Sequence, residues 1–186
     1  ADNCGWESSV RDILPDLFED WSKRFESTPE DPCAAADAYL RGARGLDITG
    51  LRGHFSQEWF HDRHRNIGSA TVRFPLPNNS YWERIIDRPG RFDKKANFKF
   101  GASYAGHWWM HPQDSFADLA TMDEIWIAEG IFDAVALHQG AGLAAVSNMS
   151  VNPYPEHFLK ALTDYLQAEG IATRPKLVFA FDVGAA

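Results

Sequence analysis

The sequence predicts an α+β fold, in which N-terminal helices and a small antiparallel sheet precede an α/β domain with a parallel sheet. Three patterns follow one another along the 186 residues. Apolar residues first recur at helical spacing, short aromatic and β-branched runs come next, and strands then alternate with helices. We expect an N-terminal helical segment and linker at 1–33, a mixed, basic α/β subdomain at 34–120, and an α/β domain at 121–186.

The amino-terminal region predicts two helical segments. Residues 6–26 carry apolar side chains at helical intervals, and Pro15 indicates a break or a second helix start. The sequence "STPEDP" that follows is typical of a linker or a helix cap. Residues 33–45 then predict a short helix that ends at Gly42 or Gly45.

The middle and the end of the chain predict two different sheets. From about 54 to 110, the runs "ATVRFPLP", "YWERIIDR", "NFKFGAS" and "HWWMHP" are separated by Gly, Pro and Asn, which predicts an antiparallel sheet with hairpins. From residue 124 onward the pattern is βαβαβ, which implies parallel strands. Its expected elements are strand 124–128, helix 131–139, strand 142–146, helix 155–169 and strand 176–181.

The net charge of −8 conceals a basic middle segment. Residues 41–99 hold 12 Lys/Arg against 6 Asp/Glu, a balance of +6. Residues 1–40 and 100–186 each hold 3 against 10, a balance of −7. A basic segment between acidic ones is a candidate contact for phosphates, although a solvated face of mixed charge gives the same count.

Several classes of protein and site are disfavoured. The sequence has no run of about 18 apolar residues that would span a membrane, and it opens on no export signal. Cys4 and Cys33 form no CxxC pair, which fits a reducing cytoplasm and disfavours a structural zinc site. Neither a GxSxG nor a GxxxxGK[ST] motif is present. The histidines are expected to be structural, including the pairs His61/His64 and His107/His111.

Carboxylates are predicted to gather at one edge of the parallel sheet. The apolar run 125–128 is followed at once by Glu129 and Gly130, and Asp133 lies one helical turn later. The strand "KLVFAF" ends on Asp182. Because functional groups collect at the carboxyl ends of parallel strands, Glu129 and Asp182 are expected side by side. Such a cluster suits Mg²⁺, whereas helix capping by Asp133 and a turn at Asp182 are the simpler alternatives.

The segments "IAEGIFDAVAL", "GAGLAAVSNMS" and "KLVFAFDVGAA" resemble the Toprim domain of bacterial primases, topoisomerases and some nucleases. Ahead of them, "AADAYLRGARGLDITGL" and "ATVRFPLPNNSYWERIIDR" resemble the polymerase core of DnaG-type bacterial primases. "KKANFKFGAS" occupies the place of that family's lysine-bearing motif. The resemblance covers about residues 34–186 and is closest to primases of phages, plasmids and other mobile elements, which often join primase to helicase.

This resemblance implies a cytoplasmic DNA primase that joins ribonucleoside triphosphates on a single-stranded DNA template with Mg²⁺ or Mn²⁺. Glu129 would be the catalytic acid, and Glu129, Asp133 and Asp182 would hold the metal. A replicative helicase, in the same chain or separate, is a further partner in that family, and no membrane partner is implied. The residues expected to contact template or triphosphate are basic: Arg84, Arg88, Lys94, Lys95 and Lys99.

Two departures from the family pattern keep other functions open. Gly184 stands where the Toprim pattern usually has a second Asp, and the chain ends at Ala186, before the usual last helix and strand. We therefore expect a C-terminally truncated fragment, and Cys4 could be the last ligand of a preceding zinc ribbon. The alternatives are a Toprim-type metal-dependent nuclease and a non-catalytic nucleic-acid-binding module derived from a primase core.

Overall fold

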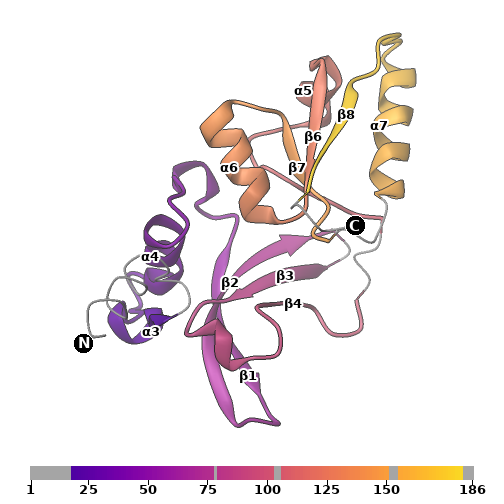
Figure 1. Cartoon of the computed structure of the whole chain (residues 1–186). Helices are drawn as coiled ribbons and strands as arrows, with labels where there is room; N and C mark the ends of the chain where they lie inside the picture. Colours follow the sequence, from indigo (N-terminus) through magenta and orange to yellow (C-terminus); the bar gives the residue numbers. More distant parts are fainter. Residues whose placement is uncertain (1–17, 78, 103–105, 151–154, 182–186) are drawn as a thin grey trace, which may run out of the picture. The chain divides into compact units, whose positions relative to one another are not determined.

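The computed structural model describes residues 18–77, 79–102, 106–150 and 155–181 (Figure 1). The chain divides into two compact units. Unit 1 comprises Ala1–Pro75 and Tyr81–Phe100, and unit 2 comprises Leu76–Ser80 and Gly101–Ala186. No helix within the described ranges is long and apolar enough to cross a membrane.

Unit 1 combines short helices with a four-stranded sheet in the order β1-β2-β3-β4. Strand β1 pairs antiparallel with β2, and β3 pairs antiparallel with β4. The elements are α3 (Trp21–Arg24), α4 (Ala34–Gly42), the 3₁₀ turns η1 (Thr49–Leu51) and η2 (Pro89–Arg91), β1 (Ser56–Asp62), β2 (Ile67–Leu76), β3 (Ser80–Ile85) and β4 (Ala96–Phe98).

Strand β2 is buried on both faces, one apolar and one polar. Ala70, Val72 and Phe74 alternate on the apolar face and are at most 1% exposed. On the polar face, the buried carboxylate of Glu83 accepts hydrogen bonds from Arg73 Nη2 (2.9 Å) and from Thr71 Oγ1 (3.2 Å). A buried carboxylate needs such partners, so this face is a paired polar layer.

Unit 2 is a four-stranded sheet in the order β5-β7-β6-β8 with helices packed around it. Strand β6 pairs in parallel with β7 and β8, whereas β5 pairs antiparallel with β7. Figure 1 shows α6 on one side of the sheet and α7 on the other. The elements are β5 (Trp109–Met110), α5 (Phe116–Thr121), β6 (Glu124–Ala128), α6 (Ile131–Ala141), β7 (Ala145–Ser147), α7 (Glu156–Ala168) and β8 (Lys176–Ala180).

Both faces of β6 are buried, as expected for a central parallel strand. Ile125 and Ile127 pack in a cluster with buried residues of α5 and α7, such as Leu119 and Leu162. Ala128, whose side chain is on the other face of the strand, is also fully buried. Helix α6 is therefore predominantly apolar, and it buries Ile131, Ala134 and Val135.

The predicted α+β class and the βαβαβ series are confirmed, with three corrections. "HWWMHP" was expected in the middle antiparallel sheet, but its strand Trp109–Met110 joins the second sheet beside β7. The strand expected at 142–146 begins at Ala145, because Gly142 takes a left-handed conformation (φ 63°) and ends α6. Within the described part of the predicted helix 6–26, α3 spans only Trp21–Arg24, flanked by non-helical residues.

Candidate functional site

Glu129 lies directly after β6, at the carboxyl edge of the sheet in unit 2, and is half-buried. The last residue of β7 and the residue after it support the main chain around Glu129. Ser147 Oγ donates a hydrogen bond to the Glu129 carbonyl (3.2 Å), and the Asn148 amide donates to the Ala128 carbonyl (2.9 Å). Ser147 and Asn148 are both buried, so the position of Glu129 is fixed by two neighbouring strands.

Asp133 lies in the first turn of α6 and caps that helix. The Gly130 amide donates a hydrogen bond to Asp133 Oδ2 (3.1 Å). This bond satisfies one of the amides that have no acceptor within the helix at its start. A methyl group at Gly130 would lie 2.6 Å from this oxygen, so the glycine leaves room for the contact. The Asp133 carboxylate therefore lies against the main chain at Gly130, where it has a local structural role.

The strand order makes this edge a topological switch point. The chain passes from β6 to β7 on one side, and then crosses to β8 on the other side of β6. Ala128 pairs with Ala180, so the carboxyl ends of β6 and β8 are neighbours. Ligands of open α/β sheets bind in the crevice at such a point. Asp182 and Gly184 lie outside the described residues.

The five predicted basic residues do not form one cluster. Arg84 pairs with Ala96 across β3 and β4, so it faces the opposite side of the sheet from residues 95 and 99. Arg88 forms an ion pair with Asp20 (2.7 Å) and its charge is partly neutralised. Lys94 and Lys95 are exposed, and Lys99 is half-buried.

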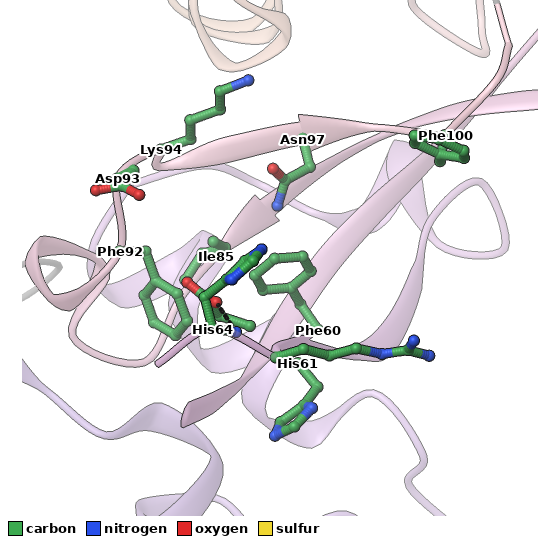
Figure 2. A pocket seen from close by; sticks show the side chains of 11 residues that line it. Phe60, His61, His64, Ile85, Phe92, Asp93, Lys94, Asn97 and Phe100 are labelled. Atoms are coloured by element: carbon green, nitrogen blue, oxygen red, sulfur yellow. Dashed lines mark hydrogen bonds between the residues drawn. The ribbon is translucent and has the colours of Figure 1, made fainter. Parts of the chain in front are cut away.

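Lys94 lines a pocket of about 570 Å³ in unit 1 (Figure 2). Figure 2 shows Phe60, His64, Ile85 and Phe92 close together, with Lys94 at one side and Phe100 at the other. The lining joins aromatic rings with cationic or polar side chains: Phe60, His61, Asp62, Arg63, His64, Ile85, Phe92, Asp93, Lys94, Asn97 and Phe100. Aromatic faces beside cationic side chains are the combination with which proteins bind single-stranded nucleic acids.

The two carboxylates of this pocket are both engaged by Arg65. Its guanidinium bonds Asp62 (3.1 Å) and makes a two-point contact with Asp93. Hydrogen bonds from Arg65 hold the pKa of both carboxyl groups below the usual range. Neither Arg63 nor Lys94 forms an ion pair within the described part of the chain. Their charges therefore remain available to an anion.

A second polar group lies at the other edge of the sheet in unit 2. His111, Asp114 and His138 each present one ligand-type atom, and these atoms lie within 4.8 Å of one another. Burial raises the pKa of the Asp114 carboxyl, and the nearby His138 opposes that shift. Sequence reasoning set His111 aside as structural and did not single out Asp114 or His138.

The sequence analysis also missed Ser147, Asn148 and the pocket residue Phe60, whereas the pocket residue Phe92 was named as an aromatic side chain that could stack bases. The run "SNMS", which begins at the last residue of a buried strand, was a usable signal for the first two. The pocket residues come from β1 and from the segment after η2, so only the folded sheet joins them.

Solved structures that resemble this chain include the polymerase domain of a bacterial primase. One is the RNA polymerase domain of Mycobacterium tuberculosis primase DnaG, with a TM-score of 0.59, 14% identity, and coverage of 95% of this chain and 64% of that chain. Another is the same domain in complex with a double-stranded DNA oligomer with a 6-nucleotide overhang, with a TM-score of 0.58, 15% identity, and coverage of 93% and 63%.

At this identity the likeness establishes a primase-like fold, and the chain spans about 64% of the length of the domain that it resembles. No protein-family model and no curated protein matches the sequence.

Proposed function

We propose that this chain is the catalytic core of a DNA primase, a nucleotidyltransferase that makes RNA primers on single-stranded DNA. The observation that carries the proposal is the place of Glu129, a half-buried carboxylate where β6 meets α6, at the switch point of the sheet. A carboxylate there serves no packing purpose, since the strand before it supplies the apolar contacts. The primase-like fold and the nucleotide chemistry expected at such an edge support the same assignment.

The donor chemistry at this edge fits a hard divalent cation, Mg²⁺ or Mn²⁺. Glu129 and Asp133 offer carboxylate oxygens from one strand–helix junction, and the Gly130 amide donates to Oδ2 of Asp133. Asp182 is the proposed third ligand. When bound, the ion would neutralise phosphate charge that develops during nucleotidyl transfer. The amino end of α6 lies at the same place, and its backbone dipole favours an anionic phosphate.

Gly184 predicts a weak metal site. With three carboxylates in place of four, Mg²⁺ binding should fall in the millimolar range, about the weak end of oxygen-ligand sites. Calorimetric titration of the parent and of Gly184→Asp tests this expectation, and the substitution should tighten binding. Micromolar binding by the parent that is abolished by Asp182→Asn would show that the ligand count is wrong.

The proposed template contact lies in unit 1. Lys94 and Arg63 line a pocket with aromatic walls, and the exposed Lys95 follows Lys94 in the sequence. Phosphates would contact the cations and bases would stack on Phe60 or on the fully exposed Phe100. One structural neighbour was solved with an overhanging DNA oligomer, which supports a nucleic-acid partner. A replicative helicase is proposed only on the family resemblance.

Primer synthesis by Glu129→Gln tests the catalytic assignment. We expect ribonucleotide incorporation on single-stranded DNA by the full-length protein to fall at least about 100-fold, because a positioned acid or base contributes this much. The matched control is Glu124→Gln at the opposite end of the same strand, where the side chain pairs with Lys176 on the surface. Both variants should unfold within about 0.5 kcal/mol of the parent.

The same assay separates the alternative functions. Retained primer synthesis by Glu129→Gln would refute the catalytic role of this residue. Cleavage of the template with no incorporation would favour a Toprim-type nuclease. Template binding with neither reaction, in the presence of Mg²⁺ and Mn²⁺, would favour a non-catalytic binding module.

A further inference from the structure

We propose that His111, Asp114 and His138 form a binding site for Zn²⁺ or a similar transition-metal ion, separate from the carboxylate edge. One nitrogen of each histidine and one carboxylate oxygen lie within 4.8 Å of one another. Two imidazoles and one carboxylate are a donor set that zinc uses in proteins, with a fourth position left to water. Mg²⁺ prefers an all-oxygen shell, so this site and the carboxylate edge should select different ions.

Two of the ligands come from one tight turn. The Asp114 amide donates to the His111 carbonyl (2.9 Å), and Pro112 stands at the second position of this turn, where its fixed φ is favourable. The Gln113 amide reaches His111 Nδ1 at 3.3 Å, a long contact. His111 is 1% exposed and anchored directly after β5. The turn therefore presents His111 and Asp114 together before any ion arrives.

The Asp114 carboxylate is placed where a cation would compensate it. Its side chain is 14% exposed, and its Oδ2 lies 3.5 Å from His138 Nδ1. That oxygen is buried and accepts no hydrogen bond within the described ranges of the chain. A carboxylate out of contact with water is costly without a partner, and a bound metal ion would supply one.

The third ligand, His138, lies in the last turn of α6. The carboxyl end of a helix favours positive charge, so a cation is electrostatically suited to this place. Glu129 lies before the amino end of the same helix, about two and a half turns away. The proposed metal site therefore lies at the opposite end of α6 from the proposed catalytic edge, and it would tie α6 to the turn after β5.

Metal binding requires one local movement. The His111 and His138 rings are stacked, with centroids 4.0 Å apart and planes at 12°. Two parallel rings cannot both direct a nitrogen lone pair at one ion, so one ring must turn. His138 is 25% exposed and can rotate about its side-chain bonds, whereas His111 is enclosed. The stacked pair must therefore open for both histidines to bind one ion.

Titration of the metal-free protein with Zn²⁺ against a chromophoric chelator tests the proposal. We expect one ion per chain at this site, and binding at least about tenfold weaker in both His138→Gln and Asp114→Asn. At about 100 times the dissociation constant, Zn²⁺ should raise the melting temperature of the parent by about 5 °C, and Mg²⁺ should not. His138→Gln should lose this rise. Substituted Co²⁺ should give the visible spectrum of a four-coordinate site in the parent.

Two control variants locate the ion. His54→Gln, at an exposed histidine of unit 1, and Glu129→Gln should both bind Zn²⁺ as the parent does. A failure of the primase assignment would leave these results unchanged. The proposal is overturned if the parent protein binds no Zn²⁺ in the chelator titration. It is also overturned if His138→Gln and Asp114→Asn bind as tightly as the parent, because the ion would then lie elsewhere.

Discussion

Neutralising Lys94, Lys95 and Lys99 should flatten the salt dependence of single-stranded DNA binding. Each phosphate contact on a single strand contributes about 0.7 to the slope of log affinity against log salt concentration, so three contacts contribute about 2. Between about 50 mM and about 200 mM salt, the parent should therefore lose about 15-fold more affinity than Lys94→Gln/Lys95→Gln/Lys99→Gln. Fluorescence anisotropy with a labelled oligonucleotide measures both slopes.

The matched control removes the same charge from unit 2. Lys160 is already paired with Asp164 (2.6 Å) and Lys176 with Glu124 (2.9 Å), so neither should release counterions on binding DNA. Lys160→Gln/Arg174→Gln/Lys176→Gln should keep the slope of the parent. Equal slopes in the two triple variants would refute the reasoning, because total charge and not its position would then govern binding.

Two further predictions concern stability and acid sensitivity in unit 1. Asp87→Ala should lower the free energy of unfolding by about 3 kcal/mol in urea titrations. The Asp87 carboxylate accepts hydrogen bonds from the buried Ala70 amide (2.8 Å) and from the Ser22 amide and hydroxyl (2.8 and 2.7 Å). A loss below about 1 kcal/mol would contradict this account. In Arg65→Met, the free energy of unfolding should fall less with decreasing pH than in the parent. Arg65 lowers the pKa of Asp93 from 3.8 in the folded protein. The stability that this pair contributes is therefore present above pH 3.8 and lost as the pH falls through the folded pKa. Urea midpoints from about pH 6 to about pH 3 measure it, and parallel curves for parent and variant would contradict it.

The sequence alone predicted the elements whose patterns are local. The run 125–128 is apolar at every position because β6 is buried on both faces, and the predicted strand has the bounds of the observed one. Glu129 and Asp133 were singled out as site candidates because a carboxylate directly after such a strand breaks the apolar pattern. The basic middle was visible by counting, whereas the separation of Arg84 from Lys95 to opposite faces needed the register of β3 and β4.

Only the tertiary structure decided which distant segments meet. The strand at Trp109–Met110 was predicted, but its place beside β7 depends on hydrogen bonds to residues 146 and 147, which no local periodicity encodes. The same pairing carries His111 toward His138, 27 residues away along the chain, and the turn at Pro112 adds Asp114. The pocket beside Lys94 likewise depends on the order of the strands in its sheet. Side-chain periodicity reports which face of an element is buried, and the partner that buries it is chosen by the packing of the whole unit.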